Sequence, residues 1–397
     1  MKWMRIFNLI LLLVVVGVYC SSNAPTKNVA DKNQTPSDTL VKPRDVSDLA
    51  GQARTSTFNN FARFIAGLPQ LQEDNFSQTE HDSLWIKHAQ KLNSKWNLMT
   101  SKRTAKLNVW AAQEVPSSMR SSEVLFYPFS GADILNANLL FPNTKSYYMF
   151  GLEPVGHLPD VLLNNSGRDS LKSYFNALNV SLNAITNFSF FRTKSMAVDF
   201  KADELNGTIH LLLLFLARNG NDIADIRYVY IDDQGKQQDN IGQKVKKNDG
   251  VEIVFVDSAH QTHFVTYYSV NLDNAHMAKN AGMGSYIKNL GGFNTYLKAA
   301  SYLMHNASFS MIRANILDQT KYLLQDDSGI PYRFFNDKNK WNSSFYGVYV
   351  PPIHLFANYM QNDLKAAYND STANTKPLNF GIGYNFKQSN LMLFEKK

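Results

Sequence analysis

Residues 123–156 read EVLFYPFSGADILNANLLFPNTKSYYMFGLEPVG, and this stretch decides the fold. It opens with an apolar, β-prone run that ends at Ser130-Gly131, which is typical of a strand entering a tight turn. Apolar side chains at helical spacing follow, and Pro142 ends that helix. Residues 146–152 form a second apolar strand. A strand, a short helix and a strand with short connections predict a βαβ unit whose two strands are parallel neighbours.

An acidic residue, Glu153, follows the second strand, about twenty positions after the Ser130-Gly131 turn. In nucleotide-binding Rossmann units a carboxylate at this place binds the ribose. The stretch therefore resembles the first βαβ unit of class I methyltransferase-like Rossmann folds, which bind S-adenosylmethionine. The resemblance implies that Ser130, Gly131 and Asp133 line the cofactor turn and that Glu153 faces the ribose hydroxyls. The turn has one glycine where the family normally has two or three. The resemblance therefore implies that this chain has a degenerate form of the family's scaffold.

The rest of the chain predicts an α/β fold. Apolar runs indicate further strands over 227–231, 251–256 and 263–270, and a helix over 171–184. The run Leu211–Leu216 fits a buried strand or a helix, because periodicity alone cannot separate the two. We expect a helical layer over residues 56–120, followed in 121–397 by a Rossmann-like, mainly parallel sheet with a C-terminal α+β extension.

The C-terminal third contains several expected elements. They are a mobile loop or lid over 280–292, amphipathic helices over 293–305 and 309–324, and a closing hairpin over 379–395 whose last strand completes the sheet. This third is also rich in aromatic residues, among them Phe356, Tyr359 and Tyr384. Core packing is the favoured interpretation of these rings, and a platform that stacks on glycans is the alternative.

Asp326 and Asp327 adjoin a Gly-Ile-Pro turn that is followed by Arg333. Paired carboxylates serve as acid and base when their surroundings push their pKa values apart. Adjacent residues in a turn more often cap backbone amides, so we expect a structural role for this pair. Arg333 is expected to meet an acidic group such as Glu153 or the carboxylate of a ligand.

His260 and His263 have a spacing that would place both on one face of a helix. Their β-prone neighbours predict a hairpin instead, and on a strand residues three apart point to opposite faces. Cys20 is the only cysteine of the chain, so a cysteine-based metal site is excluded. We predict no metal site.

The N-terminus predicts export. Lys2 and Arg5 precede an apolar run over 7–18 that is too short to span a bilayer of about 30 Å. Residues 1–19 are therefore expected to be a signal peptide, and the segment resembles the lipobox of bacterial lipoproteins. On that resemblance Cys20 becomes the acylated first residue, carrying chains of the palmitate type. Ordinary secretion and a retained N-terminal anchor are the alternatives.

The residues after Cys20 predict a flexible tether. Residues 20–55 are rich in Ser, Asn, Thr, Pro, Asp and Lys, and no aromatic residue lies between Tyr19 and Phe58. Such a segment buries too little apolar surface to offset its ordering entropy. The net charge of the chain is +7, but its basic residues are scattered, which argues against a nucleic-acid partner.

The motifs YPFSGAD, FPNTKSYYMFGLEPVG and QDDSGIPYRFF also resemble an uncharacterised family of exported proteins from Bacteroidetes-like bacteria, over residues 80–397. The resemblance implies export and no mechanism. We therefore expect a lipid-anchored protein of the bacterial cell envelope, on its periplasmic or surface face, that binds a small ligand or an envelope partner. The alternative is an envelope enzyme on a degenerate methyltransferase-like scaffold. The sequence identifies no cofactor.

Overall fold

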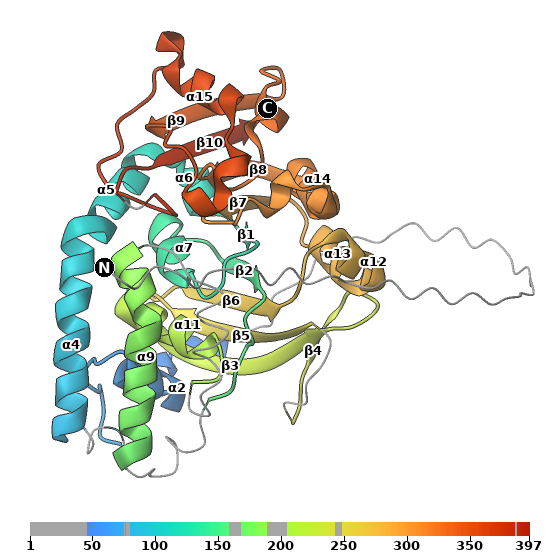
Figure 1. The fold of residues 1–397 in the computed structure, drawn as a ribbon. Helices are drawn as coiled ribbons and strands as arrows, with labels where there is room; N and C mark the ends of the chain where they lie inside the picture. The colour runs from blue at the N-terminus through green and yellow to red at the C-terminus, as the bar shows by residue number, and fades with distance from the viewer. Residues whose placement is uncertain are drawn as a thin grey trace, which may run out of the picture. The chain divides into compact units, whose positions relative to one another are not determined.

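A computed structural model describes residues 46–74, 76, 80–158, 168–188, 205–242, 248–385 and 387–397 (Figure 1). The predicted signal peptide and Cys20 lie outside these residues. The predicted tether extended to residue 55, but the structure places helices at Ser47–Ala50 (α1) and Ala53–Thr55 (η1). Val46 and Ala53 are buried against apolar side chains of the sheet, and this contact orders the end of the expected tether.

The βαβ unit predicted from residues 123–156 is present. Its elements are β1 (Val124–Tyr127), α7 (Ile134–Leu140) and β2 (Ser146–Gly151). The two strands pair in parallel, with Val124 opposite Ser146. Asp133 caps α7, because its carboxylate accepts the backbone N–H of Asn136 at 3.3 Å. This part of the sequence-based prediction is confirmed.

The strands of the described residues form one mixed sheet in the order β4-β3-β5-β6-β2-β1-β7-β8-β10-β9. The strands outside the βαβ unit are β3 (Asp222–Ile231), β4 (Gln237–Asp239), β5 (Asp249–Val256), β6 (Thr262–Ser269), β7 (Phe293–Leu297), β8 (Thr320–Gln325), β9 (Trp341–Gly347) and β10 (Asn390–Lys396). Five of the nine pairings are antiparallel and four parallel. The α/β class is confirmed, but the expectation of a mainly parallel sheet is wrong. Antiparallel strands flank the parallel centre β6-β2-β1-β7-β8 on both sides.

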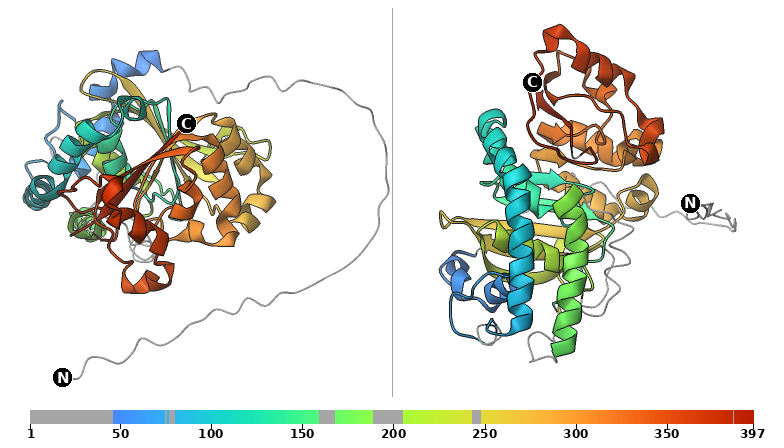
Figure 2. Two further views of the ribbon diagram at one scale, coloured as in Figure 1. Left: turned by 90° about the horizontal axis from the view of Figure 1, so that it is seen from above. Right: turned by 60° about the vertical axis from the view of Figure 1, so that its left-hand side comes forward.

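Helices cover both faces of this sheet (Figures 1 and 2). One face carries α2 (Thr57–Ile65), α4 (Ser83–Met99), α5 (Ala105–Glu114), α7, α9 (Arg168–Phe188) and α11 (Ile209–Arg218). The other face carries α12 (Asn274–Lys279), α13 (Ala281–Asn289), α14 (Ser310–Gln319) and α15 (Asn362–Asn369). Successive strand residues alternate between the two cores, so that Tyr147 joins the first and Tyr148 the second. The predicted helical layer over 56–120 belongs to the first face.

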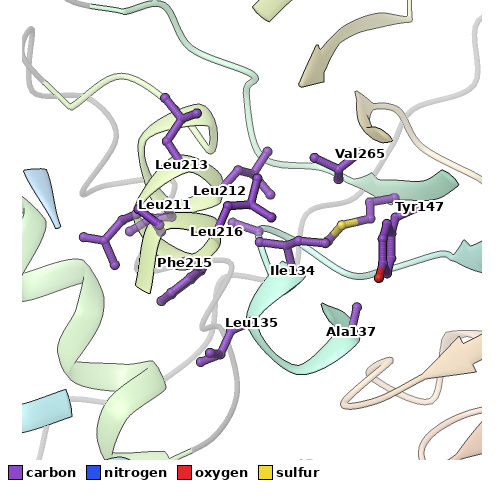
Figure 3. Packing of buried hydrophobic residues seen from close by; sticks show 14 of the residues in the cluster. Ile134, Leu135, Ala137, Tyr147, Leu211, Leu212, Leu213, Phe215, Leu216 and Val265 are labelled. Atoms are coloured by element: carbon purple, nitrogen blue, oxygen red, sulfur yellow. The ribbon is translucent and has the colours of Figure 1, made fainter. Parts of the chain in front are cut away.

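Residues Leu211–Leu216, for which the sequence left strand and helix open, lie in helix α11. Every residue from Ile209 to Ala217 is buried, which explains why the segment shows no amphipathic period. Leu and Ala are strong helix formers, and this run has few β-branched residues to favour a strand. Figure 3 shows the α11 side chains against α7 and the strands, with Ile134 between Leu216 and Tyr147.

Two C-terminal predictions are wrong, and the helix predicted over 309–324 is right only for its first part. Residues 281–289 form helix α13 rather than a loop, and Gly282 is there because a side chain would collide with the Asp232 carbonyl. Residues 293–297 are the central strand β7, and 309–324 divides into α14 and β8. All five residues of β7 are buried, so the strand lacks the alternation of a half-exposed one.

The C-terminal hairpin is also different from the prediction. Strand β10 pairs antiparallel with both β8 and β9, so it lies inside the sheet and β9 forms the edge. The described residues all belong to one compact unit, in which the helical layer shares its core with the sheet. None of the helices in the described residues has the length and apolar character needed to cross a membrane.

Candidate functional site

The carboxyl ends of β1, β2, β7 and β8 meet at one edge of the sheet, because these strands run in parallel. Open α/β sheets bind ligands in the crevice beyond this edge. The turn at Ser130 follows β1, and Glu153 follows β2. Lys298 follows β7, and Asp326 follows β8. The fold therefore brings together residues that are far apart in sequence.

A buried ion pair occupies this edge between β1 and β7. The Lys298 Nζ lies 2.6 Å from Asp133 Oδ2, and their side chains are 2% and 1% exposed. The hydroxyl of Tyr127 donates to the same oxygen at 2.8 Å, and the amide of Asn136 donates to Asp133 Oδ1 at 2.8 Å. Burial lowers the pKa of Lys298, and Asp133 opposes that shift. Each charge is thus compensated, as a buried ion pair requires.

A second cation faces Asp133 from the helical layer. Arg103 lies in a π-helical segment, Thr100–Thr104 (η2), that joins α4 to α5, and it is buried. Burial lowers its pKa to about 10, and the charge of Asp133 opposes this shift. Such π segments occur frequently at functional sites. Asp133 therefore interacts with a lysine from the sheet and with an arginine from the helices.

The other residues of the predicted cofactor turn also have partners within the protein. Ser130 is buried, and its backbone N–H and its hydroxyl donate to the Phe150 carbonyl at 2.8 and 3.2 Å. Gly131 has a positive φ of 52°. Glu153 is 4% exposed, and its carboxylate accepts the hydroxyl of Tyr267 at 3.3 Å. Ser130, Gly131 and Asp133 share one turn, but all of them and Glu153 are buried.

Asp326 caps backbone amides, as predicted. Its carboxylate accepts the N–H of Ala299 at 2.9 Å and the N–H of Ser328 at 3.0 Å. Asp327 accepts the hydroxyl of Tyr302. Burial raises the pKa of both carboxyls, and for Asp327 the neighbouring Asp326 adds to the rise, to about 7. Asp327 therefore keeps its proton to a higher pH than an exposed aspartate does.

The loop after β7 has a strained backbone. Ala299, Ser301 and Tyr302 have φ values of 52°, 53° and 54°, which only glycine adopts without cost. Each such residue costs on the order of 1–3 kcal/mol and persists only where its surroundings fix it. Here the Asp326 carboxylate, the Ser328 hydroxyl and the Asp327 carboxylate hold the loop. Strain of this kind concentrates at ligand sites and active sites.

A cavity of about 380 Å³ lies beside this loop. It is lined by His305, Pro331, Arg333, Asn358, Tyr359, Met360, Gln361, Asn362 and Asp363. The ring of Tyr359 stacks on that of Tyr302, with centroids 5.2 Å apart and planes 8° apart. Burial and the nearby Arg333 and Arg313 lower the pKa of His305 to about 4, so its ring is neutral at pH 7.

Arg333 lines this cavity and does not meet Glu153. It is exposed, its guanidinium lies 5.3 Å from the centre of the Phe334 ring, and no ion pair in the described residues joins it to Glu153. A ligand carboxylate remains the other expected partner. The sequence-based prediction missed Lys298 and Tyr302 as site residues, and it gave Tyr359 only as part of the alternative glycan platform. The sequence feature that could have marked Lys298 is its position directly after the run FNTYL at 293–297.

The two histidines with helical spacing lie in a hairpin, as predicted. His263 is on β6 and hydrogen-bonds through Nδ1 to the Thr144 carbonyl at 2.7 Å, while His260 is in the turn after β5. The described residues contain no cluster of three or more His, Cys, Asp or Glu side chains placed to hold a metal ion.

Comparison of the chain with protein-family models, with curated proteins and with solved structures found no match.

Replacing Lys298 tests the buried ion pair. Lys298→Met leaves the Asp133 carboxylate without its closest cation, and we expect the free energy of unfolding to fall by about 3–5 kcal/mol. Adding Asp133→Asn should restore only part of this loss, because the uncharged amide still caps α7 but Arg103 then stays buried without a counter-charge. The matched control Lys376→Met breaks the exposed pair with Glu114 and should cost about 1 kcal/mol or less. Equal costs for the two lysines in denaturant titrations would contradict a buried pair.

The raised pKa of Asp327 predicts a pH dependence of stability. The folded protein holds this proton up to about pH 7, whereas an unfolded Asp loses it near pH 4. The folded state therefore binds more protons in this window, and the Asp327 contribution to stability decreases as the pH rises. Burial lowers the pKa of His88 and of His305 to about 4. The contribution of these two histidines to stability therefore increases as the pH rises, opposite to that of Asp327.

Comparison with Asp327→Asn isolates the carboxyl, because the histidines are the same in both proteins. The free energy of unfolding of the wild type minus that of Asp327→Asn should be larger at about pH 4.5 than at about pH 7.5. A difference that is the same at both pH values would show that the pKa of Asp327 is not raised.

Proposed function

We propose that this protein is a lipid-anchored ligand-binding protein of the bacterial cell envelope, built on a degenerate methyltransferase-like Rossmann scaffold. Its ligand binds in the cavity beside Tyr359 and Arg333. The observation that carries the proposal is the contrast between two parts of one sheet edge. The part next to β1 is filled by Asp133 and Lys298, and the part next to β8 has a cavity.

The order of the strands supports the scaffold. The central strands β6-β2-β1-β7-β8 have the order 3-2-1-4-5 of a Rossmann sheet when they are numbered along the chain from β1. Strand β10 lies antiparallel between β8 and β9, as the last strand does in methyltransferase-like folds. The hairpin strands β3, β4 and β5 extend the sheet beyond β6 and are an addition to that plan.

The ion pair argues against an adenosyl cofactor. A cofactor bound at the β1 turn needs backbone amides and a carboxylate that are open to it. Here the Ser130 amide donates to the Phe150 carbonyl, and Asp133 is bonded to Lys298. Removing either charge to admit a ligand would leave the other buried and uncompensated, which is costly.

The cavity beside β8 has the size of a ligand site and a mainly polar lining. Small-molecule sites commonly have volumes of about 300–1,000 Å³, with a few polar groups that fix the ligand. The aromatic wall of this cavity is fixed by stacking on Tyr302, which is bonded to Asp327. Preorganised walls lower the entropic cost of binding.

An envelope enzyme on the same scaffold is the second candidate. The observation that favours it is Asp327, a buried carboxyl with a pKa of about 7 beside a strained loop. Groups with such a pKa serve as general acids or bases near neutral pH. The Tyr302 hydroxyl and the Asn390 amide bind the carboxylate of Asp327, and Tyr302 separates it from Tyr359 on the cavity wall.

Binding measurements separate these candidates. Calorimetric titration of the full chain in detergent with S-adenosylmethionine, S-adenosylhomocysteine or ATP should give no binding heat. A thermal-shift screen of sugars, amino acids and small carboxylates should raise the unfolding midpoint for at least one class. Arg333→Ala should abolish that rise, and the exposed control Lys338→Ala should keep it. Adenosyl binding that Asp133→Asn abolishes would support the enzyme and contradict the proposal.

The anchor is tested at Cys20. In the native bacterium the wild type should sediment with membranes and incorporate an alkyne analogue of palmitate. Cys20→Ala should lose the label, because no other cysteine is present. Ser21→Ala, next to it, should behave as the wild type. A Cys20→Ala protein that still sediments with membranes and still takes up label would rule out acylation at this residue.

A further inference from the structure

We infer that the ligand of the cavity beside Tyr359 is a neutral carbohydrate, an inference that rests on the proposed function. The first reason is the chemistry of the lining. Asn358 and Asn362 are exposed amides on the cavity, and no side-chain hydrogen bond within the described residues occupies either of them. An amide both donates and accepts, as a sugar hydroxyl does, so arrays of amides match arrays of hydroxyls.

The charges of the cavity are balanced. Arg333 supplies one cation and Asp363 one anion, and His305 is neutral at pH 7 because its pKa is lowered to about 4. Arg313, whose charge also acts on His305, donates to the carbonyl oxygens of Met304 and Asn306. A site for a polyanion such as a nucleotide phosphate would present an excess of cations. This balance favours an uncharged ligand, with Arg333 and Asp363 as strong hydrogen-bonding groups.

The aromatic wall is held rigidly in place. Tyr359 stacks on Tyr302, meets the ring of His305 edge-on at 5.5 Å, and shares hydrogen bonds of 3.3–3.4 Å with the amide of Asn306. A fixed aromatic ring offers a large contact area at a low cost in conformational entropy. It suits the flat, apolar C–H face of a sugar ring.

Gln361 fixes the segment that carries the two free amides. Its side-chain oxygen accepts the N–H of Tyr332 at 2.8 Å, and its side-chain nitrogen donates to the Asp327 carbonyl at 2.9 Å. The Asn358–Asp363 segment is therefore attached to the turn after β8, next to the strained loop. The cavity of about 380 Å³ is at the lower end of ligand-site volumes, which fits a monosaccharide or the end of a short oligosaccharide.

The test is calorimetry on the full chain in a detergent without a sugar head group. The probes are maltotriose, cellotriose, mannotriose and chitotriose, with glycine and glutamate as zwitterions that would pair with Arg333 and Asp363. We expect at least one trisaccharide to bind and Asn362→Ala to weaken that binding at least tenfold. Asn369→Ala, an exposed asparagine at the other end of the same helix, is the matched control and should leave affinity unchanged.

Two results would overturn the carbohydrate inference. Binding of an amino acid that Arg333→Ala abolishes, with no trisaccharide bound, would assign the cavity to a zwitterion and leave the proposed binding function intact. Trisaccharide binding that Asn358→Ala and Asn362→Ala both leave unchanged would place the sugar elsewhere on the protein. Both variants alter exposed side chains, so circular dichroism should show folded proteins in each case.

Discussion

The buried contact between Asp133 and Lys298 fixes the arrangement on which the site depends. It joins the N-cap of α7, in the turn after β1, to the residue that follows β7. Strands β1 and β7 are neighbours in the sheet and far apart along the chain. Burial makes such a pair costly unless every remaining oxygen and proton is satisfied, and Tyr127 and Asn136 complete the coordination of the carboxylate. As a result, the chain's own charges occupy the place where an open α/β sheet commonly admits a ligand. In the proposed function, the ligand binds toward β8 instead, in the cavity beside Tyr359.

The turn after β8 has two roles. Through Asp326 and Ser328 it holds the strained backbone from Ala299 to Tyr302. Through Asp327 it binds the hydroxyl of Tyr302, whose ring supports the aromatic wall of the cavity. The strain, the raised pKa and the rigid wall are therefore consequences of one local network. A network of this kind preorganises a site without any moving part.

The sequence predicted the strands up to β6 better than those of the C-terminal third. Residues 123–156 carry strand, turn and helix signals close together, and their βαβ unit is correct. Strand β7 was mistaken for a helix because all its residues are buried, and α13 was mistaken for a loop because Gly282 marks a close helix contact and not a turn. In the site, Asp133 was recognised as a turn residue. Its partner Lys298 was not, because no local pattern links residues that meet only through the sheet. Tyr302 has no sequence signature, since its left-handed backbone is imposed by Asp327 and its neighbours.

The claim that the Asp133–Lys298 pair fills the crevice at the carboxyl ends of the strands is tested most directly by the reactivity of Lys298 toward acetic anhydride. The reactivity is measured in the native protein, residue by residue, with mass spectrometry. Lys338 and Lys387 are exposed and serve as internal standards. If the ion pair fills the crevice, Lys298 should stay unmodified under conditions that acetylate both standards, and should react only after unfolding. Acetylation of native Lys298 at a rate similar to theirs would show that the crevice is open to solvent and would contradict the account.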